Sequence, residues 1–277
     1  MTFLQILEKI QGIHVAVIGD PMVDEYHFGH VNRICPEAPV PVFVTDRIET
    51  RRGGADNVAN QLEALGCKVT TCFPRSFSRK TRYVADSHML LRVDDDVWYT
   101  PTEQDYTRVE NTLTHMAFID AVVLSDYAHG WLSPEMCRRV IDVAGYRSAP
   151  VIVDPKKDCP KFAGCELICP TEEEFKDLSG FLAGRAFPNV LIKRGAKGMQ
   201  LHSLYCEEVD IPAVAKKVFD VTGAGDVVVA VVAAAGAVGA SYLEAAQLAA
   251  IAAGYVVGEV GTTVCSRGKL KELIDGS

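Results

Sequence analysis

The sequence lacks the features that would point to a membrane, a nucleic acid or a structural metal. Its most apolar stretch, Val227 to Ala240, is shorter than the about 20 residues that a membrane-spanning helix needs. Acidic residues outnumber basic ones, 36 to 28, and a net charge of −8 argues against binding to a phosphate backbone. The nine cysteines include no Cys-x-x-Cys pair, and Cys159, Cys165 and Cys169 fit no zinc spacing. We therefore expect neither a nucleic acid nor a membrane as a partner.

The amino terminus has no basic region followed by an apolar run, so no signal peptide is expected. The odd number of scattered cysteines is typical of reduced thiols in a cytoplasmic protein. Apolar residues make up 48% of the chain and charged residues 23%, a composition that supports a sizeable core. The sequence thus predicts a cytoplasmic protein with a single domain over residues 1–277.

Short apolar runs alternate with amphipathic stretches along most of the chain. The first run, His14 to Gly19, ends in Asp-Pro and predicts a fully buried strand. Further runs follow at Ala121–Leu124, Val151–Val153, Leu167–Cys169 and Val190–Ile192. Stretches such as Pro134–Ala144 predict helices between them, and Ser241–Val257 continues a helical region that begins at Asp226. The pattern predicts a doubly wound α/β fold, with a mainly parallel sheet covered by helices on both faces.

Two stretches, residues 24–47 and 81–93, contain β-like segments without a helical partner. Pro39 and Pro41 favour an edge strand there, because proline cannot donate a hydrogen bond to a sheet ladder. We predict that these stretches form a small β lid that stands off the main domain. A homodimer that pairs through the apolar edge of the lid is a hypothesis.

The most specific motif is the heptapeptide Asp-Val-Thr-Gly-Ala-Gly-Asp, from Asp220 to Asp226, which a long apolar segment follows. Gly223, Ala224 and Gly225 let the backbone approach a ligand, and at a helix start their N–H groups form a concavity for an anion. Asp226 would lie beside a transferring phosphoryl group and accept the proton of an attacking hydroxyl. The alternative is a tight turn in which Asp226 is only a helix N-cap.

A second motif, Gly53-Gly54-Ala-Asp-Asn57, opens a segment whose apolar residues share one helical face. Two glycines ahead of a helix permit backbone contact with a ligand, and Asn57 offers both a donor and an acceptor to sugar hydroxyls. A glycine turn before a helix is common, so this motif alone is equally well explained as local structure.

In this order and at this separation, the two motifs resemble the signatures of the ribokinase family of sugar kinases, also called the phosphofructokinase-B type. Within the family, further segments are similar to the kinases that phosphorylate D-glycero-β-D-manno-heptose 7-phosphate at O1 for lipopolysaccharide precursor synthesis. These segments are Gly19-Asp20 with Asp24, Arg33–Val42, Lys80–Arg82, Leu91–Asp94, Asp126–Gly130, Val153–Lys156, Arg194-Gly195 with Gly198-Met199, and Gly258–Thr262. The resemblance covers nearly the whole chain.

The resemblance implies an ATP-dependent sugar kinase that uses Mg²⁺ and has a doubly wound domain with a small β lid. Asp24 and Asn57 would hold sugar hydroxyls, and Gly53-Gly54 would lie beneath the sugar. Asp226 would be the base, and Gly223–Gly225 would form the anion hole for the γ-phosphate.

The resemblance also implies sites for the nucleotide and for metal ions. Glu174 is similar to the glutamate of the family's Asn-x-x-Glu motif, which organises magnesium and its waters, although Thr171 replaces the asparagine. Asp220 and Thr222 match positions that often bind a monovalent cation such as K⁺. Lys193 stands where a threonine or serine commonly contacts ATP, so its ammonium is expected to meet a phosphate. The implied nucleotide-binding residues are Thr171, Lys193, Gly195, Gly198 and Thr222.

Four basic residues fall in the lid-like stretches, where guanidinium groups would clamp the phosphate of a small sugar phosphate. They are Arg33, Lys80, Arg82 and Arg92. Taken singly, each is better explained as a solvated surface cation, and we expect two of the four to be ligands.

The chain also departs from the family pattern. Ala250 replaces an asparagine expected near the nucleotide. Between Cys72 and Lys80 the chain lacks a strand–helix unit of longer relatives, and the segment from Glu174 to Val190 is trimmed. These departures bear on nucleotide affinity and on the choice of acceptor.

Two other functions stay open: a kinase for another sugar or sugar phosphate, and a non-catalytic relative that binds sugar or nucleotide. A Rossmann dehydrogenase is disfavoured, because the turn after the first strand reads Gly19-Asp-Pro and not Gly-x-Gly-x-x-Gly.

Overall fold

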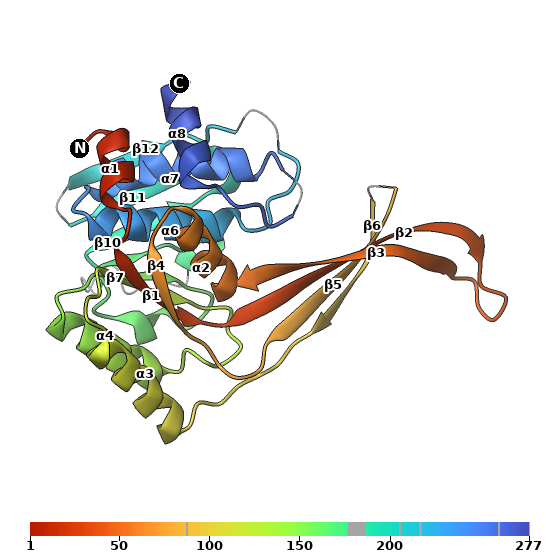
Figure 1. Cartoon of the computed structure of the whole chain (residues 1–277), viewed down its shortest axis with the longest axis horizontal. Coiled ribbons are helices and arrows are strands. Elements are labelled where there is room, and N and C mark those ends of the chain that lie inside the picture. Colours follow the sequence, from red (N-terminus) through yellow and green to blue (C-terminus); the bar gives the residue numbers. More distant parts are fainter. Residues whose placement is uncertain (87, 177–186, 205, 216–217, 260, 277) are drawn as a thin grey trace.

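The computed structural model describes residues 1–276 except for 87, 177–186, 205, 216–217 and 260. Its described residues form a main sheet of eight strands and a second sheet of four (Figure 1). The main sheet contains β1 (His14–Gly19), β4 (Lys68–Cys72), β7 (Ala121–Ser125), β8 (Val151–Asp154), β9 (Leu167–Ile168), β10 (Asn189–Lys193), β11 (Met199–Ser203) and β12 (Cys206–Ile211). The second sheet contains β2 (Pro21–Ile34), β3 (Pro41–Gly54), β5 (Ser78–Ala85) and β6 (His88–Asp95).

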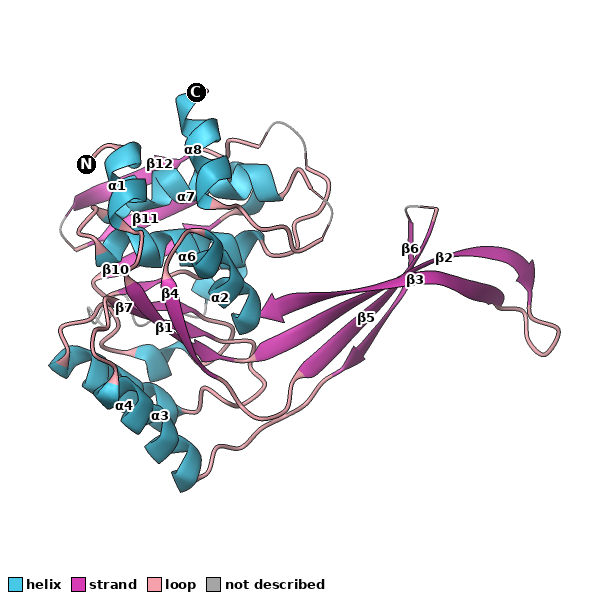
Figure 2. Ribbon diagram, in the orientation of Figure 1, coloured by secondary structure: helices cyan, strands magenta, loops and turns pink. Residues whose placement is uncertain are grey.

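The helices lie on both faces of the main sheet (Figure 2). They are α1 (Phe3–Lys9), α2 (Ala55–Ala64), α3 (Glu103–His115), α4 (Pro134–Tyr146), α6 (Ala224–Ala237), α7 (Tyr242–Val256) and α8 (Arg267–Asp275), with short 3₁₀ turns η1 (Cys159–Phe162) and η2 (Gly195–Lys197). Among the described residues, no helix is long and apolar enough to cross a membrane.

The main sheet has the order β12-β11-β10-β9-β8-β7-β1-β4. Its strands from β4 to β10 run parallel, and β11 and β12 extend it in antiparallel fashion. Successive side chains of a strand point to opposite faces. In β1, Val15 and Val17 therefore join the core under α1, α2, α6, α7 and α8, whereas Ala16 and Ile18 join the core under α3 and α4. The predicted fold class, a doubly wound α/β domain, is confirmed.

Helix α6 is apolar around its whole circumference, as expected for a helix that other elements surround. Residues Asp226 to Ala235 are buried, and the helix packs against the sheet as well as against α2 and α7. The next helix, α7, begins with a capping box in which Ser241 and Glu244 bond each other's backbone N–H groups. The two helices pack against each other, and they cover the main sheet where α6 meets β7 and β8 and α7 meets β11 and β12.

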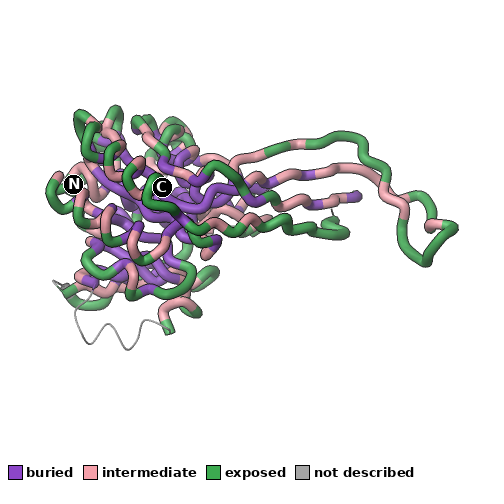
Figure 3. Tube along the Cα trace, turned by 90° about the horizontal axis from the view of Figure 1, so that it is seen from below, coloured by how far each residue is buried: buried purple, intermediate pink, exposed green. Residues whose placement is uncertain are grey.

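The second sheet, with the order β3-β2-β5-β6, extends away from the main sheet (Figure 1). Strands β2 and β3 pair from Pro21 opposite Gly54 out to Ile34 opposite Pro41, so the sheet begins nearer the core than residue 24. Its root is buried, whereas its far end is mostly exposed (Figure 3). We call these four strands the lid sheet.

The main sheet and the lid sheet are joined by a short link. Residues 73–77 run from the end of β4 to the start of β5 and contain neither strand nor helix. As a result, β4 is the terminal strand of the main sheet.

Candidate active site

The start of α6 provides a site for an anion. Gly223 is its N-cap, with a φ of +80°, and a side chain there would meet the amide of Asn57 at 2.9 Å. The first turn of a helix leaves N–H groups without intrahelical partners, and the helix dipole favours negative charge beside them. Of the three residues predicted for the anion hole, Ala224 donates its N–H to the carbonyl of Val221 at 3.2 Å. That N–H group is therefore engaged within the turn.

Asp226 lies in this first turn and is only 4% exposed. Its Oδ2 accepts a hydrogen bond from Nδ2 of Asn57 at 2.7 Å, and its Oδ1 accepts one from the hydroxyl of Tyr127 at 2.7 Å. Burial raises the pKa of Asp226 to about 6, although both hydrogen bonds oppose the rise. A carboxylate with a pKa close to neutral suits a general base.

Asn57 lies near the start of α2 and is fully buried. Its Nδ2 is bound to Asp226, but its Oδ1 has no hydrogen-bond partner within the described part of the chain. A buried acceptor without a partner costs free energy, so a ligand hydroxyl at this position would be stabilising. The predicted contact between Asn57 and a sugar hydroxyl fits this geometry.

Asp24 and Arg82 lie at the root of the lid sheet. Both are buried, and Nη1 of Arg82 donates to Oδ1 of Asp24 at 2.5 Å. A side chain at Gly53 would collide with the Asp24 carboxylate, and one at Gly54, which has a φ of +57°, would meet the backbone oxygen of Asp20. The two glycines therefore let the end of β3 pass close beneath Asp24.

Of the other basic residues predicted for the phosphate clamp, Lys80 lies opposite Asp24 and Arg92 lies opposite Arg82 in the strand register, whereas Arg33 lies farther out on the lid sheet. Lys80 and Arg92 form ion pairs with Asp94 at 3.2 Å and 2.8 Å. Arg33 is exposed and lies nine residues beyond Asp24 along β2, a separation of about 30 Å at the usual rise per residue. The structure thus brings Arg82 to Asp24 and does not bring Arg33 there.

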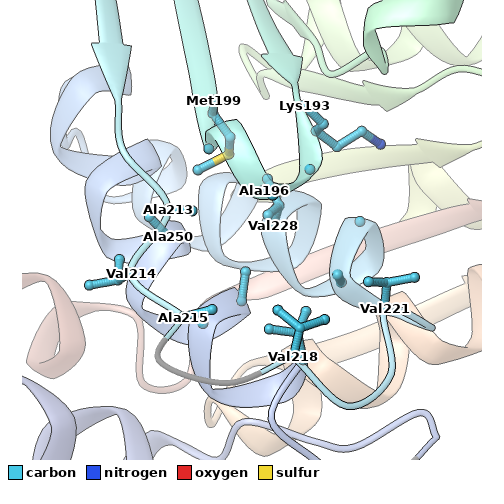
Figure 4. Close-up of a pocket in the computed structure, with 17 residues that line it drawn as sticks. Lys193, Ala196, Met199, Ala213, Val214, Ala215, Val218, Val221, Val228 and Ala250 are labelled. Atoms are coloured by element: carbon cyan, nitrogen blue, oxygen red, sulfur yellow. The ribbon is translucent and has the colours of Figure 1, made fainter.

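An apolar cavity of about 220 Å³ opens beside the anion hole (Figure 4). It holds Gly195 and Gly198 from the predicted nucleotide site, and Ala250, the residue that replaces an asparagine. The remaining lining residues are Lys193, Ala196, Met199, Ala213, Val214, Ala215, Val218, Val221, Ala224, Gly225, Val228, Ala253, Gly254 and Val257. Such a slot suits a flat apolar ring such as adenine.

Lys193 lies at the edge of this cavity, where β10 ends (Figure 4). It forms a buried ion pair with Asp154, the last residue of β8. Its ammonium is 3.3 Å from the point where a side chain of Gly225 would begin, so it faces the anion hole. Burial acts against the charge of Lys193, but Asp154 outweighs it and raises the pKa, so the side chain stays cationic.

Thr171 and Glu174 form a capping box at the start of the helical residues 172–176. The N–H of Thr171 donates to Glu174 at 2.8 Å, and the N–H of Glu174 donates to the Thr171 hydroxyl at 3.3 Å. Threonine thus performs a cap role that asparagine also performs. Most of the segment from Glu174 to Val190, predicted to be trimmed, lies outside the described residues.

Two carboxylates near the anion hole, Asp154 and Glu174, are each paired with a lysine, Lys193 and Lys156. Glu174 acts electrostatically on both Asp154 and Lys193, so the three groups are neighbours. Over the described ranges, no cluster of three or more His, Cys, Asp or Glu residues is suited to a metal. Mg²⁺ usually keeps several waters and is held by one or two carboxylates together with substrate phosphates. Asp154 and Glu174 supply this kind of donor set.

Hydrogen bonds to Asp220 connect the loop before α6 with the loop that contains Gly261. Its Oδ1 accepts hydrogen bonds from the N–H and the hydroxyl of Thr222, at 2.9 and 2.7 Å, and its Oδ2 accepts one from the N–H of Gly261 at 3.0 Å. Burial acts to raise the pKa of Asp220, but these bonds together lower it. The carboxylate therefore stays ionised beside the anion hole.

Tyr127 and Asp154 were not assigned roles from the sequence. Both lie in segments that carry the family resemblance, Asp126–Gly130 and Val153–Lys156. That resemblance was the available signal, but spacing could not show that either side chain meets a residue from a distant part of the chain.

Comparison with known proteins agrees with this geometry. Residues 98–268 match the family described as pfkB family carbohydrate kinase. The bifunctional protein HldE of Caulobacter sp. strain K31 is 37% identical over 322 residues, which cover 99% of this chain and 65% of the relative. HldE of Geobacter metallireducens is 36% identical and covers 92% of this chain and 61% of the relative. The chain therefore spans a little over three fifths of the length of these relatives. Because the first match is 322 residues long and the chain has 277, that relative carries internal residues that this chain lacks.

Solved structures agree on the fold. Ribokinase of Arabidopsis thaliana, complexed with ribose and ATP, superposes with a TM-score of 0.68 at 18% identity, over 96% of this chain and 100% of that one. Phosphofructokinase-2 of Escherichia coli, in complex with potassium, gives 0.72 at 15% identity, over 96% and 99%. Kinases of this fold use ATP and Mg²⁺. The chain belongs to the pfkB family of carbohydrate kinases, and the predicted enzyme class, an ATP-dependent sugar kinase, is confirmed.

Proposed function

We propose that this chain transfers the γ-phosphoryl group of ATP to O1 of D-glycero-β-D-manno-heptose 7-phosphate and gives the 1,7-bisphosphate. The observation that carries the proposal is the buried Asp226, whose pKa of about 6 and position in the first turn of α6 suit a base beside a phosphoryl group. The segments that resemble heptose 7-phosphate kinases, and the similarity to HldE over most of the chain, support the choice of acceptor.

In this mechanism the acceptor hydroxyl gives its proton to Asp226 as its oxygen attacks the γ-phosphorus. The N–H groups at the start of α6 and the ammonium of Lys193 stabilise negative charge on the phosphoryl oxygens. Asn57 accepts a hydrogen bond from the sugar through its unpartnered Oδ1. Mg²⁺, when bound with the nucleotide, neutralises phosphate charge, and Asp154 and Glu174 are the residues proposed to hold it.

The acceptor phosphate is proposed to lie at the root of the lid sheet. Arg82 is the basic residue predicted for the clamp that reaches the buried Asp24, and its guanidinium lies over the ring of Tyr26 at 5.1 Å. A guanidinium in this position presents a planar donor edge to a phosphate. Asp220 and Thr222 are proposed as the site of a monovalent cation, which the potassium complex of phosphofructokinase-2 supports by analogy of fold.

A second copy of the chain is the partner proposed for the lid sheet. Ile48, His27, Tyr83 and Leu91 form a row across all four strands, on the face opposite to Asp24. Ile48 and Leu91 are each 56% exposed. An apolar row of this kind on an open sheet is a surface for association.

The test is ATP- and Mg²⁺-dependent release of ADP by the purified chain. Heptose 7-phosphate, fructose 6-phosphate, ribose and a control without sugar are compared as acceptors at matched concentrations. Turnover with heptose 7-phosphate alone supports the proposal, and phosphorus NMR of the product then shows whether O1 carries the new phosphate. Turnover with a different acceptor keeps the mechanism and replaces the substrate. A folded chain that binds ATP without turning over any acceptor contradicts the proposal.

A further inference from the structure

We propose that Tyr127 is a positioning residue for Asp226, and that Asp20 holds Tyr127 in place through the backbone of its loop. Tyr127 would orient the carboxylate and favour its ionised form, and it need not touch the sugar or the nucleotide. The inference rests on the proposed role of Asp226 as the base.

The hydrogen bonds of Asp226 define the orientation of its carboxylate. Tyr127 donates to Oδ1 and Asn57 donates to Oδ2, each at 2.7 Å, so each oxygen is bound by a different element, one by the loop after β7 and the other by α2. One donor for each oxygen fixes the plane of the carboxylate. The directions of the lone pairs that remain are then fixed, and a reacting hydroxyl must approach along one of them.

The hydroxyl of Tyr127 is a constant donor. Burial raises the pKa of Tyr127 well above its ordinary value, so the phenol stays protonated at any working pH. A donor to a carboxylate favours the charged form and lowers its pKa. The other groups that face Asp226 are Asp154 on β8, which acts to raise its pKa, and Lys193 on β10, which acts to lower it. Tyr127 thus works in the same direction as Asn57 and Lys193.

The loop that carries Tyr127 donates three backbone N–H groups to one buried carboxylate. Asp20, which is 2% exposed, accepts hydrogen bonds from the N–H groups of Tyr127 at 3.0 Å, His129 at 3.3 Å and Trp131 at 3.4 Å. Within the loop, Ala128 adopts a φ of +59°, a left-handed conformation that a residue with a side chain seldom holds without support. The N–H of Ala128 donates to Oδ1 of Asp126 at 2.9 Å, and the bonds to Asp20 hold the residues on either side of it.

The test compares the pH dependence of kcat/KM in Tyr127→Phe with that of the unchanged chain. The variant keeps the ring and removes the hydrogen-bond donor. The acid limb of the profile, where kcat/KM falls as the pH is lowered, is expected near pH 6 in the unchanged chain and should move up by about one pH unit in the variant. The alkaline plateau should fall much less than it does in Asp226→Asn. Tyr106→Phe is the matched control, because it removes another tyrosine hydroxyl, bound to Ser133 at 3.1 Å, without touching Asp226. Its acid limb should stay in place.

A direct measurement separates positioning from folding. Carbon-13 NMR of aspartate carboxyl groups, with Asp226→Asn used to identify the signal, gives the pKa of Asp226 with no need for turnover. Asp20→Asn should move this pKa upward as well, because the loop loses part of its anchor.

Each outcome decides the matter. An upward shift of the acid limb and of the carboxyl titration in Tyr127→Phe, absent in Tyr106→Phe, supports the proposal. An unchanged acid limb, or a loss of turnover that is equal at every pH, overturns it and leaves Tyr127 with a structural role only. If Asp226→Asn itself keeps its turnover, the proposed base is wrong, and that failure is distinct from a failure of the Tyr127 proposal.

Discussion

The two halves of the site differ in how they are built. On the core side, Asp226 and Asn57 are buried and fixed by hydrogen bonds between distant parts of the chain. On the lid side, Arg92 is 49% exposed in its side chain and pairs with a neighbour two residues away, and Arg33 is exposed at the far end. Groups held in a dry core are already oriented for a reaction, whereas exposed ion pairs contribute little and exchange partners readily. Phosphoryl transfer therefore depends on the core, and the choice of acceptor depends on the lid sheet.

The lid sheet repeats this difference along its own length. At its root, Asp24, Tyr26 and Arg82 are buried against the main domain. Beyond Phe28 its residues are mostly partly buried or exposed. Substitutions at the root should therefore act on binding of the acceptor, and substitutions toward the far end should act on association or have no effect.

The largest effect is expected for Asp226→Asn, which removes the base and keeps the shape. The value of kcat should fall by about 10²–10⁴-fold, the usual contribution of a general base. The melting temperature should change little, because Asn still fits between Asn57 and Tyr127. Steady-state kinetics and calorimetry check both points, with Asp142→Asn, an exposed aspartate paired with Arg138, as the control. If the Asp226→Asn variant kept most of its turnover, Asp226 on the core side would not be the catalytic base.

The next effect is expected at the root of the lid sheet. Arg82→Lys keeps the charge but loses the planar fork, so KM for the sugar phosphate should rise by about tenfold while kcat changes less. Arg33→Ala should leave KM within about twofold, because Arg33 is about 30 Å from Asp24 along β2. An equal rise of KM in both variants would contradict this expectation, and it would mean that the lid sheet of a second copy brings Arg33 to the site.

Lys193→Met tests the cation at the anion hole. The affinity for ATP should fall by about tenfold, and more than the affinity for ADP, because the ammonium faces the position proposed for the terminal phosphate. Loss of one partner from a buried pair is also destabilising, so the double variant Lys193→Met with Asp154→Asn serves as a control for folding. Calorimetric titration should show that the double variant regains stability without regaining ATP affinity. Equal losses for ATP and ADP would contradict the assignment.

The pH dependence follows from the buried base. Because the pKa of Asp226 is about 6 in the folded chain and 3.8 in its ordinary state, kcat/KM should fall about tenfold per pH unit below 6. Between pH 4 and 6 the folded state binds the extra proton, so the contribution of this group to stability decreases as the pH rises through that window. Across this window kcat/KM should therefore rise with pH, whereas the stability of the unchanged chain relative to Asp226→Asn, measured by thermal melts, should fall. The same rise in rate in a chain with Asp226→Asn would assign the pKa to another group.

The smallest effect on the single chain is expected at the outer face of the lid sheet. Ile48→Asp places a charge in the exposed apolar row, so it should dissociate a dimer with almost no change in the melting temperature of the monomer. Light scattering at several concentrations measures the change in mass, and Thr50→Asp, two residues away on the same face, shows whether the effect depends on the apolar position. A chain that is monomeric before substitution would contradict the proposed dimer.

Much of the fold was predictable because burial leaves a local pattern. The apolar run His14–Gly19 is β1 at the predicted bounds, and the sequence before Asp226 leads into a helix start as expected. The distance that the lid sheet extends from the main domain was not predictable, because the alternation of polar residues is similar at its root and at its far end. Nor could the sequence pair Tyr127 with Asp226, because a contact across 99 positions depends on how the strands assemble.

The link between the two sheets has a consequence for solubility. Because residues 73–77 lead straight from β4 into the lid sheet, β4 ends the main sheet with one row of backbone N–H and C=O groups facing outward. An open row of this kind is a template on which strands of other molecules can stack into aggregates. Lys68 and Thr71 are exposed on this strand, and a charged residue at such an edge discourages stacking. Lys68 at this edge should therefore lower the tendency of the chain to aggregate.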